Sequence, residues 1–216
     1  MTTFPGSPRI AKGGIVLLDP KRGTVLRILP LQYNPDTLTR SLQVRGAGAD
    51  GGDHLEALRL KGPPVETIKL EAEVDATDLL ESGDDQTIRN GLHAALAALE
   101  TIVYPTSAQL LANHAEAASG SLEILPVQSP LSVFVFGAGR IVPVRITEMT
   151  ITEEAFDVAL NPIRAKLELS LRVLSVDDLG FDPKGAGVFL AYLRAKEQFA
   201  RQSRTGTFGD LRVMAF

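Results

Sequence analysis

The residues that could support metal or acid–base chemistry include three histidines, His54, His93 and His114. His54 follows Asp53 in a glycine-rich stretch, where the pair could contribute ligands to a metal ion. A metal site needs several ligands at a recognisable spacing, and no further ligand accompanies this pair. His93 and His114 lie in stretches with helical periodicity and are interpreted as helix-surface or boundary residues. The histidines therefore predict no metal site.

Neighbouring carboxylates form three pairs, Asp84-Asp85, Glu153-Glu154 and Asp177-Asp178. Two catalytic acids have to flank a substrate, but adjacent residues on a strand point to opposite faces of the sheet. Helix capping and turn roles explain the pairs more simply. The chain also contains no cysteine, which excludes thiolate metal sites and cysteine nucleophiles together.

Two glycine motifs resemble functional motifs only superficially. Gly137-Ala138-Gly139 lies between two strand patterns and not before a helix, so a hairpin turn is favoured over a phosphate loop. Ser119-Gly120-Ser121 does not complete the spacing of a serine nucleophile elbow. We therefore expect a protein without catalytic residues and without a cofactor, which is not an enzyme.

The charge and composition of the sequence restrict the classes of binding partner that can be expected. The 26 acidic and 22 basic residues are not collected into blocks, so no nucleic-acid surface is expected. The absence of tryptophan argues against a stacking platform for bases or sugars. Met1 to Ile10 hold no apolar block of signal-peptide length, and nowhere do about 18 uncharged apolar residues follow one another. The sequence predicts a soluble protein that folds in the cytoplasm and has no membrane contact in its resting state.

The first strand patterns lie near the N-terminus. Residues 14–19 and 24–33 are separated by a turn that contains Pro20 and Gly23, which predicts a hairpin. Asn34-Pro35 then marks a corner, because Pro restricts the residue before it. Residues 36–44 alternate apolar and polar side chains, with Arg40 as an exception on the apolar side.

Four further stretches have strand patterns. Residues 65–74 predict a strand with one buried face. Residues 131–136 and 140–151 predict a second hairpin, with a bulge near Thr147 or Glu148 because the apolar phase shifts there. After Asn161-Pro162, residues 163–173 give the most regular alternation in the chain.

Helical periodicity occurs in three stretches. Residues 85–103 predict one helix with Asp84 or Asp85 as its cap and an apolar stripe of Ile88, Leu92, Leu96, Leu99 and Val103. Residues 107–118 predict a second helix. Residues 186–202 predict a third helix, with one face formed by Phe189, Tyr192, Leu193, Lys196 and Phe199.

Two segments are candidates for contacts between subunits. The glycine-rich loop from Arg45 to Pro64 is expected to reach an adjacent subunit or to fold back onto its own sheet, with Leu55, Leu58 and Leu60 along one apolar edge. The tail is expected to dock on a neighbouring protein, or to fray beyond a helix packed on its own domain. Its apolar residues are Leu211, Val213, Met214 and Phe216.

Four segments resemble the N-terminal domain of tube-initiator proteins of contractile injection systems, a family that often carries a LysM module. The segments are LPLQYNPDTLTRSLQV, PPVETIKLEAEVDATD, LHAALAALETIVYP and PLSVFVFGAGRIVPVRITEMTITEEAFDVALNPIRAKLELSLRVL. Together they span about residues 10 to 176. The resemblance implies an α+β fold in which a phage tail-tube-like antiparallel β-barrel or sandwich carries a flanking helix. It also implies a hexameric ring that connects a spike protein to an inner tube protein among other baseplate proteins.

We therefore expect a β domain over residues 1–176, with a helical insertion at about 85–118, followed by a C-terminal helix and docking extension over 177–216. The extension lacks the two-helix pattern of LysM, so peptidoglycan binding is not expected. The expected role is a structural baseplate ring, assembled in the bacterial cytoplasm and carried by an injection particle that can be released. Two alternatives stay open: a non-contractile phage tail tube or tail-completion protein, and a small-ligand or carbohydrate-binding β-domain.

Overall fold

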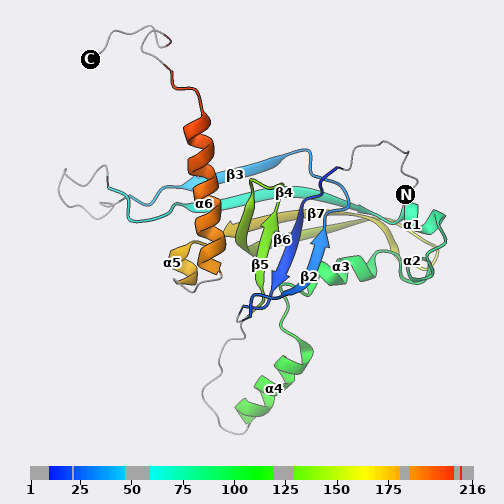
Figure 1. The fold of residues 1–216 in the computed structure, drawn as a ribbon. Coiled ribbons are helices and arrows are strands. Elements are labelled where there is room, and N and C mark those ends of the chain that lie inside the picture. Colours follow the sequence, from blue (N-terminus) through cyan, green and yellow to red (C-terminus); the bar gives the residue numbers. More distant parts are fainter. Residues whose placement is uncertain are drawn as a thin grey trace.

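The computed structural model describes residues 10–20, 22–46, 59–118, 129–180, 185–206 and 210. Its strands are β1 (Gly14–Leu18), β2 (Val25–Pro30), β3 (Leu38–Gln43), β4 (Val65–Asp75), β5 (Leu131–Val135), β6 (Ile141–Phe156) and β7 (Pro162–Val173). They form one antiparallel sheet in the order β2-β1-β5-β6-β7-β4-β3 (Figure 1). The helices are α1 (Thr77–Glu81), α2 (Asp85–Asn90), α3 (His93–Glu100), α4 (Ser107–Ala118), α5 (Val176–Leu179) and α6 (Gly185–Gln202). The mixed α+β class with an antiparallel sheet is confirmed.

The long strands follow the alternation in the sequence. In β7, Leu167, Leu169 and Leu171 are buried on one face, and in the adjacent β4, Ile68 and Leu70 are buried on the same face. The side chains between them point to the opposite face, because successive residues of a strand alternate between the two sides of a sheet. The two predicted hairpins, β1–β2 and β5–β6, are also present.

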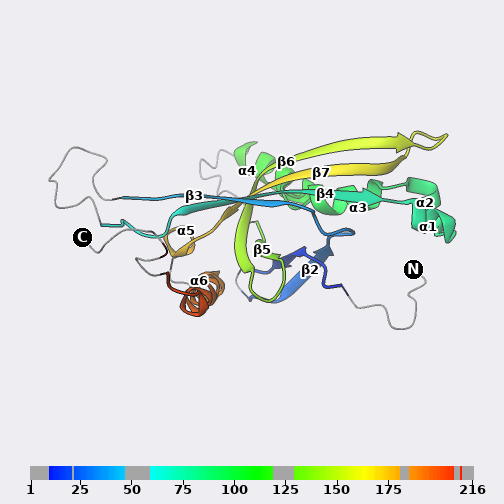
Figure 2. The same cartoon turned by 90° about the horizontal axis from the view of Figure 1, so that it is seen from above.

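Strand β6 belongs to two layers of the structure. Residues 141–144 pair with β5, whereas residues 144–156 pair with β7. Figure 2 shows β6 curving from the layer of β1, β2 and β5 toward that of β3, β4 and β7. The register shifts between Ile146 and Glu148, which confirms the predicted bulge. The layers enclose one core, whose most buried large side chains include Ile15, Ile68, Phe134, Val142, Leu167 and Leu171.

Polar contacts join the two layers without closing the sheet. The side chain of Gln32, just after β2, accepts a hydrogen bond from the backbone of Asp75 at 2.9 Å and donates one to its carbonyl at 2.8 Å. Strands β2 and β3 stand at opposite ends of the strand order, and in the described part of the chain they do not pair with each other. The predicted barrel is therefore present here only as a curled sheet.

The predicted helix over residues 85–103 was wrong, because the chain breaks at Gly91 into α2 and α3. Gly91 has a φ of 53°, and an added Cβ would lie 2.5 Å from the carbonyl oxygen of Pro162. The break rotates the two parts of the expected stripe relative to each other: Leu92 and Leu96 are buried, while Ile88 is 52% exposed. Helices α4 and α6 have nearly the predicted bounds.

The two Asn-Pro corners hold distant segments together. The Asn34 side chain accepts a hydrogen bond from the backbone of Gly13 and donates one to the carbonyl of Ala11, both at 2.9 Å. The Asn161 side chain donates to the carboxylate of Asp157 at 2.8 Å and to the carbonyl of Arg89 at 3.2 Å. Each asparagine therefore acts as a backbone clamp beside a turn, in addition to being a turn residue.

Candidate assembly surfaces

The most buried charged group of the described residues is Glu66, near the start of β4, whose side chain is 4% exposed. Its carboxylate accepts hydrogen bonds from Arg40 of β3 at 2.7 Å, from the Tyr192 hydroxyl at 2.8 Å and from Lys196 at 2.7 Å. Lys196 also lies 4.1 Å from the centre of the Tyr192 ring. Because Tyr192 and Lys196 belong to α6, this cluster attaches α6 to the β3–β4 hairpin.

The electrostatics of this cluster favour an ionised carboxylate. Burial alone would raise the pKa of Glu66, but the hydrogen bonds from Lys196, Arg40 and Tyr192 outweigh it and hold this pKa below its ordinary value. Burial, followed by the bond to Glu66, raises the pKa of Tyr192, so its hydroxyl stays protonated. The carboxylate oxygens of Glu66 already accept hydrogen bonds from three neighbouring side chains and are not available for proton transfer to a substrate. This arrangement indicates a structural role.

One end of the sheet is formed by β2, whose outer backbone edge has no partner strand among the described residues. Val25, Leu26 and Ile28 are exposed on this strand, and Ile28 is 62% exposed. An unpaired edge with apolar side chains is a template for pairing with another chain. We call β2 and these side chains the β2 edge.

The opposite end of the sheet is formed by β3, which continues with β4 as a projecting hairpin. Beyond the strands, Lys61 donates a backbone hydrogen bond to the carbonyl of Arg45 at 2.9 Å, and Gly46 bridges to Leu60. Residues 42–46 and 59–64 of this hairpin are called the arm (Figure 1). Its apolar side chains Leu42, Val44 and Leu60 are exposed, Leu60 by 70%. Both ends of the sheet therefore present apolar surface at a free strand.

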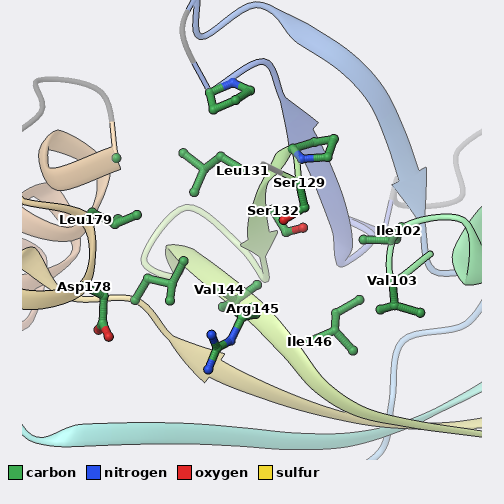
Figure 3. Close-up of a pocket in the computed structure, with 14 residues that line it drawn as sticks. Ile102, Val103, Ser129, Leu131, Ser132, Val144, Arg145, Ile146, Asp178 and Leu179 are labelled. Carbon is green, nitrogen blue, oxygen red and sulfur yellow. The ribbon is translucent and has the colours of Figure 1, made fainter. Parts of the chain in front are cut away.

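A cavity of about 460 Å³ lies between β5, β6, the segment after α3 and the start of α6 (Figure 3). Its wall mixes apolar and polar surface, and the lining includes Ile102, Leu131, Val144, Leu179 and Ser132. Asp178 also lines the cavity, but its carboxylate already accepts hydrogen bonds from Arg172 at 2.6 Å and from the Ser175 backbone at 3.0 Å. The cavity has the volume of a small-ligand site, and the polar side chains of Ser129 and Arg145 also line it.

The residues that were considered for chemistry from the sequence lie on exposed helix surfaces or take part in helix capping and ion pairs. His93 and His114 are exposed on α3 and α4, and no group of three or more metal-binding side chains occurs in the described residues. Asp84 caps α2 by accepting a hydrogen bond from the Thr87 backbone at 2.9 Å. A second hydrogen bond from the Thr87 hydroxyl at 2.7 Å, together with the backbone bond, lowers the pKa of Asp84. Glu154 binds Lys166 at 3.2 Å. The expected capping role is thus confirmed for Asp84.

The Asp177-Asp178 pair is divided between two contacts. Asp177 binds Arg45 of the arm at 2.6 Å. Asp178 completes a capping box with Ser175 at the start of α5. Gly137 has a φ of 78° in the turn between β5 and β6, so the predicted hairpin turn is confirmed there.

Several residues singled out in the sequence lie outside the described residues. These are His54 and the serine motif 119–121, which were weighed for chemistry, and the expected contact residues Leu55, Leu58, Leu211, Val213, Met214 and Phe216. Leu60 is the one predicted contact residue that the structure describes, and it is exposed on the arm. The Glu66 cluster was not predicted, although Arg40 on an apolar strand face and Lys196 on an apolar helix face were the signals that could have found it.

Comparison with known proteins assigns no family to the chain. No protein family model matches the sequence, and no curated protein matches it. None of the helices in the described part of the chain is long and apolar enough to cross a membrane.

Proposed function

We propose that this protein is a structural component of a contractile injection particle, in which a hexameric ring connects the spike to the inner tube at the baseplate. The observation that carries the proposal is the pair of free, apolar ends of one sheet, the β2 edge and the arm. A chain with two different association surfaces joins copies head to tail. Such contacts close into a ring when the rotation from one copy to the next permits.

The energetics support assembly through these ends. Fully burying a side chain of the size of Leu or Ile contributes about 1.5 to 3 kcal/mol, so Leu26 and Ile28, each more than half exposed, add roughly 1 to 2 kcal/mol apiece when covered. Backbone hydrogen bonds along the free edge contribute about 0.5 to 1.5 kcal/mol each. The same contacts recur at every junction of the ring. The curled sheet would then be completed by its neighbours, as expected for a tail-tube-like fold.

The resemblance of residues 10 to 176 to tube-initiator domains supplies the particle and the partners. Spike, inner tube and other baseplate proteins are therefore proposed partners, and the role is structural, without catalysis or cofactor. A non-contractile phage tail would use the same surfaces, so the type of particle follows from the resemblance alone. The small-ligand alternative is favoured by one observation, the cavity of about 460 Å³.

Electron microscopy of the chain co-expressed with its genomic neighbours tests the proposal. We expect annular particles with sixfold symmetry. The Ile28→Lys variant places a charge on the β2 edge and is expected to abolish the rings while leaving the circular dichroism spectrum unchanged, because Ile28 is already exposed. The matched control Leu111→Ser, on the exposed face of α4, should still form rings.

A dispersed 23 kDa monomer under every condition would contradict the ring and favour the small-ligand alternative. In that case native mass spectrometry of the protein from cells should detect a bound small molecule. A substitution that fills the cavity, Ser132→Leu, should displace it.

A further inference from the structure

The cavity between β5, β6 and the start of α6 contains a buried hydroxyl group without a hydrogen-bond partner (Figure 3). Ser132, which lines this cavity, is only 5% exposed, and its Oγ makes no hydrogen bond with any described residue. The strand register places Ser132 between Leu17 of β1 and Val144 of β6, so neither neighbouring strand supplies a polar side chain there. A buried hydroxyl without a partner costs free energy, and such groups in folded proteins normally have one. Ser132 therefore marks a position for a polar atom that the described residues do not supply.

Hydrogen-bond acceptors are also too few at the edge of the cavity. Arg145 of β6, another lining residue, lies directly opposite Arg172 of β7, and like charges in this arrangement repel each other. Asp178 is the one carboxylate among the described residues that line the cavity. Its oxygens accept hydrogen bonds from Arg172 at 2.6 Å and from the backbone and hydroxyl of Ser175 at 3.0 and 3.2 Å. Even so, the buried Nε of Arg172 has no partner, and Arg145 makes no hydrogen bond or ion pair with any described residue. Two guanidinium groups thus share one carboxylate, which leaves the charge of Arg145 uncompensated.

The other lining residues restrict the class of molecule that fits. Most of their side chains are aliphatic: Ile102, Val103, Leu131, Val144, Ile146, Leu174 and Leu179. No aromatic side chain is among the described residues that line the cavity, so a base or a sugar would have no ring to stack on. A phosphate dianion would meet one unpaired cation in this lining, whereas the planar guanidinium of Arg145 matches the two oxygens of a carboxylate. The lining therefore favours a molecule with an apolar body and a single carboxylate.

We propose that this cavity binds a small organic acid. Its carboxylate binds Arg145 at the edge, its apolar body fills the interior, and a carbonyl or hydroxyl group on the body forms a hydrogen bond with the Oγ of Ser132. The volume of about 460 Å³ lies in the range that is typical of small-molecule sites.

This binding goes beyond the proposed structural role and does not rest on it. None of the described residues that line the cavity belongs to the β2 edge or to the arm. Each copy in a ring could therefore hold its own ligand. In the small-ligand alternative, by contrast, binding replaces assembly as the role of the protein.

Equilibrium dialysis of the full chain with radiolabelled octanoate tests the contact with Arg145. We expect a Kd of about 1 mM or tighter for the unmodified protein. Arg145→Gln should weaken octanoate binding roughly tenfold, because a hydrogen-bonded ion pair is lost. The same variant should bind radiolabelled octanol as the unmodified protein does, because octanol has no charge. Arg194→Gln is the matched control, since Arg194 is exposed on α6 and does not line the cavity.

A keto acid tests the contact with Ser132. It has the same chain as octanoate and carries a carbonyl beside the terminal methyl group, so it can accept a hydrogen bond inside the cavity. We expect it to displace octanoate from the unmodified protein at a roughly fivefold lower concentration than unlabelled octanoate does. Ser132→Ala should remove this preference. In thermal unfolding without ligand, Ser132→Ala should be no less stable than the unmodified protein, because its hydroxyl has no hydrogen bond to lose.

The two contacts fail in different ways from the ring. Ile28→Lys should remove the rings and leave octanoate binding unchanged, and Arg145→Gln should leave the rings unchanged. The inference is overturned if the unmodified protein does not bind octanoate, or if Arg145→Gln binds it as tightly as Arg194→Gln does. It is also overturned if Arg145→Gln loses octanol and octanoate equally, or if Ser132→Ala keeps the preference for the keto acid.

Discussion

Replacing Glu66 by glutamine tests whether the buried cluster attaches α6 to the sheet. The side chain keeps its size but loses its charge, and its new amide group points two donors toward a site already filled by donors. Arg40 and Lys196 then lack the carboxylate that they bind at 2.7 Å, and the Tyr192 hydroxyl loses a charged acceptor. We expect the folded state to be destabilised and α6 to detach more readily.

The size of the expected loss of stability depends on how exposed the side chains of Arg40 and Lys196 are. Removing one member of a fully buried ion pair costs about 3 to 5 kcal/mol. Here the side chains of Arg40 and Lys196 are 28% and 33% exposed, so they can turn toward water and recover part of the loss. We therefore expect a decrease of about 3 kcal/mol in the free energy of unfolding. For a chain of this length that corresponds to a fall of roughly 6 to 12 °C in Tm.

Urea unfolding followed by circular dichroism measures this change. Glu71→Gln is the matched control, because Glu71 lies on the same strand with its side chain on the exposed face. Its effect should stay within about 0.5 kcal/mol. A Glu66→Gln variant as stable as the control would refute the view that the cluster stabilises the fold.

The pH dependence gives an independent check. Because the pKa of Glu66 is lowered on folding, its contribution is present above the unfolded pKa of about 4.3 and is lost as pH falls through the folded value. The stability difference between the unmodified protein and Glu66→Gln should therefore be complete at pH 7 and should shrink below about pH 4. A difference that persists unchanged at pH 3 would mean that the charge is not its source.

Two further substitutions probe the helical region. Gly91→Ala should destabilise the protein by about 3 kcal/mol or more, because the new methyl group meets the Pro162 carbonyl. Gly83→Ala is the control, because its new methyl group has open space and should cost only about 1 kcal/mol. Thermal unfolding compares the stability of the two variants. Leu96→Ala removes a side chain that is 2% exposed and should cost about 2 to 5 kcal/mol, whereas Ile88→Ala should stay within about 0.5 kcal/mol. Equal losses for Leu96 and Ile88 in urea unfolding would contradict the break at Gly91.

Most of the strands and hairpins were predictable from the amino-acid sequence. The alternation over residues 163–173 and the change of phase near Thr147 are local signals, because the two-residue period of a strand places its side chains whatever the partner strand is. The turn residues Gly23 and Gly137 likewise marked the hairpins, since their positive φ is a property of the turn itself. These features were predictable without any knowledge of distant contacts.

The position of the helix break and the identity of the buried charge depend on contacts between distant parts of the chain. A glycine inside a helical pattern is tolerated in many helices, and the carbonyl of Pro162, far along the chain, is what makes the break at Gly91 specific. Glu66 lies 126 residues from Tyr192 and 130 from Lys196, so no local pattern could show that one carboxylate collects both. The order of the strands and the curl at β6 depend on the same long-range packing. It brings together residues whose separation in the sequence carries no information about their contact.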